Sequence, residues 1–261
     1  MSEAFKDNQL ALFPYLTAGF PDQQQSPELI KAMIQAGADG IEIGIPFSDP
    51  MADGLTLQRA NEQALQQGAS TLTALHLARF ARGLSDRPAI TFMSYYNPIL
   101  AFGEEPFCES AARAGADGLI VPDLPPEESG PLRAACQATG LAYIFLLSPN
   151  SPPERLAVVA ELAEGFIYCV ALVGVTGARR ELSSGLAEFL ARVRAATSVP
   201  LAVGFGISRP EHVRAMHGLA DGVIVASALA DLIDSTPAPE RAAAVAQRIR
   251  ELKTAAEGSR A

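Results

Sequence analysis

Two carboxylates occur eleven residues apart in one largely apolar stretch near the start of the chain. Glu42 lies between Ile41 and Ile43 in a run typical of a buried β-strand, and Asp53 follows in an Ala-Asp-Gly segment. An ionised carboxylate in an apolar core costs several kcal/mol unless it is paired, so its pKa rises instead. No basic residue lies in the surrounding segment. We therefore predict that Glu42 is a general acid/base with a raised pKa that faces Asp53 across a pocket.

Each carboxylate also has a purely structural interpretation. Glu42 could point outward and pair with an arginine of a packed helix, although the nearby Gly44 and Pro46 favour a strand shaped around a ligand. Asp53 could simply be a turn former, because Asp before Gly is common in turns. Asp49, in the same loop, has the same turn-forming explanation and a weaker claim to chemistry.

Glycine-rich segments end three later apolar runs and predict a phosphate site. They are Gly174-Val175-Thr176-Gly177, Gly204-Phe205-Gly206-Ile207-Ser208 and Val225-Ala226-Ser227. Glycine permits close backbone approach, and free N–H groups at a helix N-terminus bind anions. Each cluster alone would usually be only a turn, but their order along the chain favours a shared site. The second cluster does not extend to G-x-G-x-x-G, so a dinucleotide fold is disfavoured.

The chain has only three lysines, and their positions exclude one common route of carbon–carbon cleavage. Lys6, Lys31 and Lys253 lie in terminal or helical segments, whereas a Schiff base needs a desolvated lysine inside the site. The three histidines show no metal-ligand spacing, and no G-x-S-x-G motif occurs. The chemistry left by these exclusions is acid/base catalysis by carboxylates on a phosphorylated ligand, without a metal.

The elements that must hold these residues alternate between short apolar runs and longer segments with helical spacing. Most of the runs are apolar at successive positions, as expected for parallel strands with both faces buried. A chain of 261 residues fits the length of about 250 that is usual for a (β/α)8 (TIM) barrel. We predict one such domain over residues 1–261, with extra short helices and a frayed tail at 258–261. The eight runs are Leu10–Thr17, Gly40–Pro46, Ala89–Asn97, Gly118–Asp123, Ala142–Pro149, Phe166–Val173, Leu201–Ile207 and Asp221–Ala226.

A weak internal repeat precedes three of the runs. Each copy ends in an Asp-Gly pair: Asp39-Gly40, Asp117-Gly118 and Asp221-Gly222. Here a helix ends and a strand begins, so these turns belong to the bottom of the barrel and contribute to stability. The predicted catalytic and phosphate-binding residues fall at the opposite ends of the strands, where the sites of barrel enzymes are built.

Composition excludes several classes of function. The net charge of −9 is the wrong sign for a nucleic-acid-binding protein, and 49% hydrophobic residues allow a large core. No apolar stretch is long enough to span a membrane, and the N-terminus does not resemble a secretory signal. Cys108, Cys136 and Cys169 lie far apart in the sequence among apolar or helical neighbours, which predicts buried reduced thiols. We expect a cytoplasmic enzyme.

The segment from Glu42 to Gly54 (EIGIPFSDPMADG) resembles the signature of tryptophan synthase α subunits. The likeness continues in the same order over nearly the whole chain. The resemblance implies a TIM-barrel lyase of tryptophan biosynthesis, a branch of aromatic amino-acid biosynthesis, that splits indole-3-glycerol phosphate into indole and glyceraldehyde 3-phosphate. The further matching segments are Leu16–Pro21, Tyr95–Pro98, Val121–Pro125, Gly174–Gly177 and Gly204–Ser208.

The resemblance also implies roles for individual residues. Glu42 would carry a proton between the glycerol hydroxyl and the indole carbon, and Asp53 would accept a hydrogen bond from the indole N–H. Tyr168 matches a tyrosine near the catalytic glutamate, although it could equally be a core tyrosine. The phosphate would be bound by backbone N–H groups at Gly177, Gly206, Ala226 and Ser227, and the indole would be lined by Tyr15, Ile120 and Phe205.

Three departures from the family pattern concern the phosphate site and the mobile loops. Ala226 stands where Gly is usual, Leu55 where Pro is usual, and Ala171-Leu172-Val173 where hydroxyl side chains are common. None of these positions belongs to the predicted catalytic pair.

Family members work as an α2β2 heterotetramer, in which the β subunit carries pyridoxal phosphate. The resemblance therefore implies a β-subunit partner and no cofactor on this chain. Two alternatives stay open at this stage. One is another phosphate-binding barrel, such as an isomerase of histidine biosynthesis, and the other is a non-catalytic barrel that only activates a β-type partner.

Overall fold

The strands form a closed parallel barrel. The computed structural model describes residues 1–5, 9–170, 185–204 and 206–258. Neighbouring strands pair in parallel in the order β5-β4-β3-β2-β1-β9-β8-β7-β6. Their bounds are β1 (Ala11–Thr17), β2 (Gly40–Gly44), β3 (Ala89–Met93), β4 (Gly118–Ile120), β5 (Ala142–Ile144), β6 (Leu146–Leu147), β7 (Ile167–Val170), β8 (Leu201–Gly204) and β9 (Gly222–Val225).

The two ends of that order are parts of one chain segment. Only Phe145 separates β5 from β6, and its carbonyl accepts a hydrogen bond from the Tyr168 N–H at 2.9 Å. β5 pairs with β4 while β6 pairs with β7, so this bent segment closes the ring. The predicted eight-stranded barrel is therefore confirmed, with its fifth strand divided in two.

Several predicted strands are shorter than their apolar runs. The third run was expected to extend to Asn97, but β3 ends at Met93 and the helix α4 begins at Tyr96. The second ends at Gly44 and not at Pro46. The last residues of these two runs follow the strands and lie outside the sheet. The end of the sixth run, residues 171–173, lies outside the described residues, as do 259–261 of the predicted tail.

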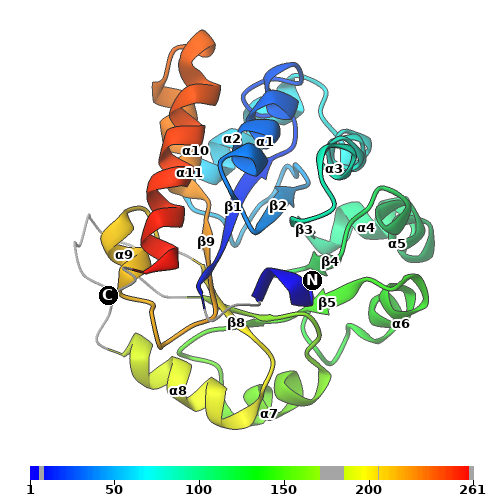
Figure 1. The fold of residues 1–261 in the computed structure, drawn as a ribbon. Helices are drawn as coiled ribbons and strands as arrows, with labels where there is room; N and C mark the ends of the chain where they lie inside the picture. The colour runs from blue at the N-terminus through cyan, green and yellow to red at the C-terminus, as the bar shows by residue number, and fades with distance from the viewer. Residues whose placement is uncertain (6–8, 171–184, 205, 259–261) are drawn as a thin grey trace.

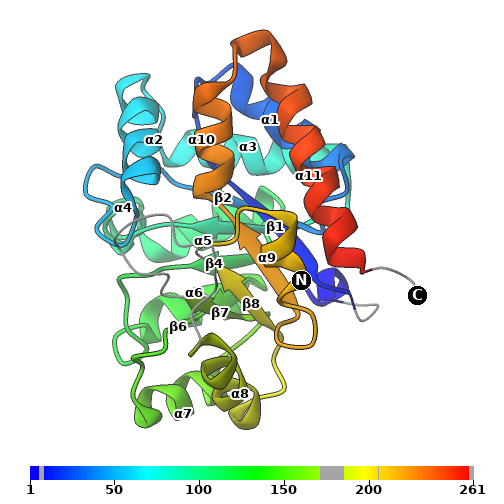
Figure 2. The same cartoon turned by 90° about the vertical axis from the view of Figure 1, so that its left-hand side faces the viewer.

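Helices surround the barrel, which Figure 1 shows along its axis. In the side view of Figure 2, the N-terminus and the end of the last helix lie at the same end of the barrel. No helix in the described ranges is long and apolar enough to cross a membrane. The helices are η1 (Ser2–Phe5), α1 (Gln25–Gln35), α2 (Leu55–Gln66), α3 (Thr71–Leu84), α4 (Tyr96–Phe102), α5 (Glu104–Arg113), α6 (Gly130–Thr139), α7 (Pro153–Leu162), α8 (Leu186–Ala196), α9 (Pro210–Arg214), α10 (Ser227–Ser235), η2 (Ala238–Glu240) and α11 (Arg241–Glu257).

The aspartates of the Asp-Gly repeat connect strands and helices at the bottom of the barrel. The carboxylates of Asp39, Asp117 and Asp221 accept hydrogen bonds from the backbone N–H groups of Leu12, Ile90 and Leu201, at 2.7 to 2.8 Å. Each of these N–H groups lies at or near the start of a neighbouring strand. The same three carboxylates form ion pairs with helix residues Lys253, Arg82 and Arg194, respectively. The repeat thus satisfies strand-end donors and ties helices to the sheet, which confirms its structural character.

The glycines of the repeat make room for large side chains inside the barrel. A Cβ atom on Gly40 would lie 2.0 Å from Cε1 of Phe13. The Phe13 ring in turn contacts Phe166 and Phe5, with ring centroids 5.5 Å away in both cases. Because β1 and β7 are not neighbours in the sheet, the contact between Phe13 and Phe166 crosses the interior. Phe5 of η1 therefore closes the barrel from below.

We expect Gly40→Ala to lower the free energy of unfolding by about 1 to 3 kcal/mol, because the added methyl group forces the Phe13 ring out of its place. Urea denaturation measures the change. Gly83→Ala is the matched control, since its Cβ meets open space at the end of α3 and should be neutral or stabilising. Phe13→Leu should partly rescue Gly40→Ala. Equal stability of the two alanine variants would contradict this packing.

All three cysteines are buried and unbridged, as predicted. Two of them are nevertheless close in space, with 3.7 Å between the sulfur atoms of Cys108 on α5 and Cys136 on α6. Helix packing brings together thiols that the sequence separates by 28 residues.

Candidate active site

Glu42 lies in the middle of β2 and is 1% exposed. Its Cα is paired with Tyr15 of β1 on one side and with Thr91 of β3 on the other. Within the described part of the chain, neither carboxylate oxygen has a hydrogen-bond partner and no ion pair involves this residue. Burial, with a further contribution from the charge of Asp53, raises the pKa of Glu42 to about 8. The outward, arginine-paired interpretation does not fit this environment.

Asp53 approaches the same space from the loop that precedes α2. It is 8% exposed, and burial raises its pKa to about 6 against the opposing effect of a hydrogen bond from Asn61. One carboxylate oxygen, Oδ1, is buried without a partner among the described residues. At neutral pH Asp53 is therefore mainly ionised while Glu42 is mainly protonated. Two carboxyl groups with separated pKa values can divide acid and base roles between them.

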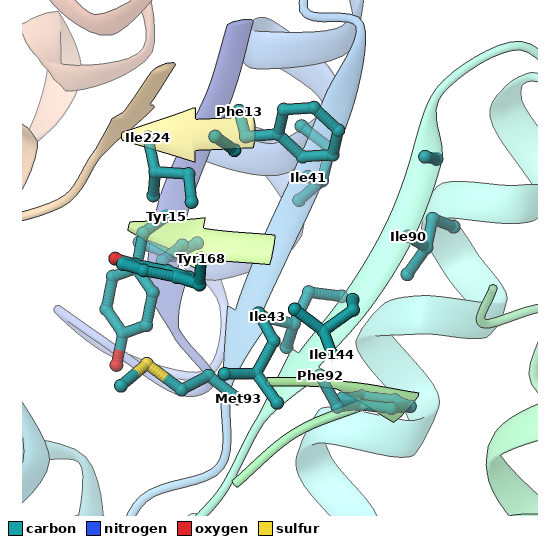
Figure 3. Packing of buried hydrophobic residues seen from close by; sticks show 14 of the residues in the cluster. Phe13, Tyr15, Ile41, Ile43, Ile90, Phe92, Met93, Ile144, Tyr168 and Ile224 are labelled. Atoms are coloured by element: carbon teal, nitrogen blue, oxygen red, sulfur yellow. The ribbon is translucent and has the colours of Figure 1, made fainter. Parts of the chain in front are cut away.

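Two tyrosines enclose the carboxylates from the barrel wall. Tyr15 of β1 and Tyr168 of β7 are almost fully buried and both point into the barrel (Figure 3). Burial raises the pKa of both hydroxyl groups, and the charges of Glu42 and Asp53 raise them further. Both tyrosines thus remain neutral and stand in the electrostatic field of the carboxylate pair.

Glycines opposite the tyrosines create the space that the rings occupy. A Cβ atom on Gly44 would lie 2.0 Å from the hydroxyl oxygen of Tyr15, and one on Gly204 would lie 2.2 Å from that of Tyr168. The Tyr15 hydroxyl is also 3.2 Å from Oγ1 of Thr17. Close approach between ring and backbone requires glycine at both positions. This accounts for Gly44 beside the buried glutamate.

Three of the four predicted phosphate-binding residues are described, and they follow two adjacent strands. Gly206 follows β8 with φ of +81° and is exposed, while Ala226 follows β9 and caps α10, which begins at Ser227. β8 and β9 are paired in parallel, so these segments leave the sheet at the same end. The N–H groups of Ala226 and Ser227 precede the first hydrogen bond of α10, in which Leu229 donates to Ala226, and N–H groups at this position of a helix can bind an anion. Gly177 and Phe205 lie outside the described residues.

Ile120 ends β4 and is fully buried in the core, where its Cα is paired with that of Met93. Its carbonyl accepts a hydrogen bond from the Ser94 N–H at 3.0 Å. Through Met93, this places Ile120 level with Gly44 at the C-terminal edge of the sheet, two residues beyond Glu42. Asp49, by contrast, is exposed and accepts a hydrogen bond from the Ser48 hydroxyl, which fits the turn-forming interpretation.

The family model described as tryptophan synthase alpha chain matches residues 1–259. The chain belongs to this family. The alpha chain of Roseiflexus sp. (strain RS-1) is 51% identical over 243 residues, which are 93% of each chain. A tryptophan synthase structure from Mycobacterium tuberculosis superposes with a TM-score of 0.90 at 35% identity and covers 99% of this chain and 96% of that one. A tryptophan synthase α2β2 complex from Pyrococcus furiosus superposes with a TM-score of 0.88 at 38% identity, and the match covers 95% of this chain and 98% of that one.

Two residues that sequence reasoning did not single out hold the tryptophan synthase signature loop in place. The Tyr95 hydroxyl accepts a hydrogen bond from the Ala52 N–H at 2.9 Å, and its ring packs on Phe47 at 5.4 Å between centroids. Asn61 is 3% exposed and contacts both ends of the loop. A buried asparagine between Ala60 and Glu62 on a helix was the available signal, since asparagine is a poor helix former.

Proposed function

We propose that this chain is the α subunit of a tryptophan synthase and cleaves indole-3-glycerol phosphate into indole and glyceraldehyde 3-phosphate, with Glu42 and Asp53 as its catalytic pair. The observation that carries the assignment is a buried glutamate that has no partner among the described residues and whose pKa is about 8, beside a second carboxyl group whose pKa is about 6. Family membership supplies the substrate and the reaction.

In the proposed reaction, protonated Glu42 donates its proton to C3 of the indole ring, and the positive charge that develops on the ring is stabilised by the Asp53 carboxylate at the indole N–H. Glu42, now ionised, then accepts the proton of the glycerol hydroxyl. The O–H electrons form the aldehyde C=O, and the electrons of the breaking C–C bond return to the ring. Glu42 ends as it began, protonated, and no proton or electron is left over.

The protonated ring is itself the electron sink in this scheme, so the reaction needs neither an imine nor a metal. Two of the three lysines are engaged elsewhere, Lys31 in an ion pair with Glu28 and Lys253 in one with Asp39; Lys6 lies outside the described residues. The described residues contain no cluster of three potential metal ligands. We propose that the chain itself uses no cofactor and that pyridoxal phosphate belongs to the partner.

The proposed partner is a tryptophan synthase β chain in an α2β2 assembly, the assembly that the Pyrococcus furiosus structure contains. The face around the signature loop is suited to such a contact. Met51 is 87% exposed and Leu55 78% exposed, and a groove of about 830 Å³ beside them is lined partly by Phe47, Pro50 and Leu65. Exposed apolar side chains grouped in this way commonly mark protein interfaces. The three buried free thiols suit a reducing compartment, so the proposal includes a cytoplasmic location.

The test is an assay of indole release from indole-3-glycerol phosphate, with the purified chain alone and with a β chain. We expect release by the chain alone and faster release in the complex. A chain that raises β-chain activity but releases no indole in either assay would be the non-catalytic activator, and the proposed function would be wrong.

Ser227→Asp tests the phosphate site separately from folding. A carboxylate at the start of α10 interacts favourably with the helix dipole, so the variant should fold at least as well as the wild type. The same negative charge would repel the substrate phosphate, and we expect KM to rise by about 100-fold with little change in the free energy of unfolding. Ser227→Ala, which keeps the backbone N–H, should raise KM less than 10-fold. An unchanged KM in Ser227→Asp would place the phosphate elsewhere.

A further inference from the structure

The side-chain amide of Asn61 joins the two ends of the loop that carries Asp53. Its Oδ1 accepts a hydrogen bond from the Phe47 N–H at 3.1 Å, three residues after the end of β2. Its Nδ2 donates to Oδ2 of Asp53 at 3.4 Å and to the carbonyl of Leu57 at 2.8 Å. The buried amide of Asn61 thus contacts the first residue of the loop, the carboxylate of Asp53 at the end of the loop, and the backbone of α2.

The chemistry of these contacts requires an amide. The Phe47 N–H needs an acceptor, while an ionised Asp53 needs a donor, and an asparagine side chain offers both at once. An aspartate at position 61 would keep the acceptor but replace the donor with a negative charge. An alanine would be the better helix former at this position by about 0.6 kcal/mol, so local propensity does not explain the asparagine.

Within the described part of the chain, the hydrogen bond from Asn61 favours the charged form of Asp53. It lowers the pKa of Asp53, whereas burial raises it. The 3.4 Å length leaves room for shortening, and contacts of this kind are often long before substrate binds. Asn61 therefore affects both the position and the ionisation of this carboxylate.

We propose that Asn61 is a positioning residue for the lyase reaction: it ties the loop of residues 47–53 to α2 and holds the Asp53 carboxylate over the barrel mouth in its ionised form. This inference rests on the proposed function, since it gives Asp53 the task of stabilising the protonated indole. In this proposal Asn61 acts through its contact with Asp53 and takes no part in proton transfer.

The experiment compares Asn61→Ala and Asn61→Asp with the matched control Gln58→Ala. Gln58 also lies on α2 and donates to Asp53, but to its backbone carbonyl, at 2.8 Å, and not to its carboxylate. For Asn61→Ala we expect kcat to fall by about 10- to 100-fold, because small misplacements of a catalytic group have effects of this size, with KM changed less than threefold. For Gln58→Ala we expect less than a threefold change in both constants.

The pH profile separates positioning from a purely structural role. Without the hydrogen bond Asp53 holds its proton to higher pH, so the acid limb of the kcat profile should move to higher pH in Asn61→Ala. It should move further in Asn61→Asp, which keeps the contact with Phe47 but adds a like charge. The limb should stay in place in Gln58→Ala.

The outcomes are distinguishable. If Asn61→Ala loses stability but keeps the kcat and acid limb of Gln58→Ala, Asn61 is only structural and the inference is wrong. If Asn61→Asp matches the wild-type profile, the donor is not needed and the inference is equally wrong. If the wild type and Gln58→Ala also release no indole, the proposed function fails, and this inference fails with it.

Discussion

Glu42→Gln should abolish indole release while leaving the barrel folded. The substitution keeps the size of the side chain but removes the group that holds and moves the proton. General acid/base groups contribute about 100- to 10,000-fold, and Glu42 is assigned both transfers, so we expect kcat to fall by 1,000-fold or more. Single-turnover release of indole from indole-3-glycerol phosphate measures the loss. Near-normal turnover by a folded Glu42→Gln protein would show that another residue moves the proton.

The same variant has a second expected result, in stability. In the wild type the pKa of Glu42 is about 8 when folded against an ordinary value of 4.5, so the folded state binds a proton that the unfolded state releases. The contribution of Glu42 to the free energy of unfolding is therefore fully present below pH 4.5 and is lost as the pH rises toward 8. Glu42→Gln removes this loss, and its free energy of unfolding should fall less steeply over that interval.

Urea denaturation at a series of pH values measures this difference. Glu188→Gln, which removes an exposed carboxyl group on α8, is the control and should leave indole release unchanged. A parallel pH dependence of stability in the wild type and in Glu42→Gln would mean that Glu42 is ionised in the folded protein, which would contradict its role as the proton donor.

The barrel was predictable because its determinants are local in sequence. A strand buried on both faces must be apolar at successive positions, so β8 and β9 could be located from their residues alone. The Asp-Gly repeat could be assigned to the bottom of the barrel for the same reason. Even so, its bonds from Asp39 to Lys253 and Leu12 depend on contacts between distant segments, which the sequence does not display.

Strand ends were less predictable, and the third apolar run shows why. Ser94 and Tyr95, which follow Met93, are as buried as the strand itself, so the end of β3 is not marked by a change to exposed residues. The helix α4 begins at Tyr96, where the backbone N–H donates to the carboxylate of Asp123 from the next loop at 2.9 Å. That acceptor is 27 residues away in the chain, so local preference could not reveal it.

The candidate site also contains residues that the sequence could identify and residues that it could not. Glu42 could be identified from sequence because a lone carboxylate among isoleucines conflicts with burial, and such conflicts commonly mark functional positions. Asn61 and Tyr95 could not, since their importance lies in the backbone and side-chain groups that the fold brings to them. Tyr168 stands between these cases, because only the closed barrel places β7 within the field of Glu42 on β2.

Asp53→Asn should leave the loop in place and still lower kcat by about 100-fold or more, since it removes the charge that stabilises the protonated ring. The asparagine oxygen can still accept the hydrogen bond from Asn61, so position is retained while charge is lost. KM should change little if the carboxylate acts mainly in the transition state. Steady-state kinetics with indole-3-glycerol phosphate separate the two constants.

The variant should also change the pKa of Glu42. Because the charge of Asp53 contributes to the raised pKa of Glu42, its removal should bring that pKa below the wild-type value of about 8. The interval over which stability falls should then end at a lower pH than in the wild type, and urea denaturation between pH 5 and 9 would detect the change. If Asp53→Asn lowered kcat but left this interval unchanged, the charge of Asp53 would not contribute to the pKa of Glu42. Burial alone would then have to account for the raised pKa of Glu42.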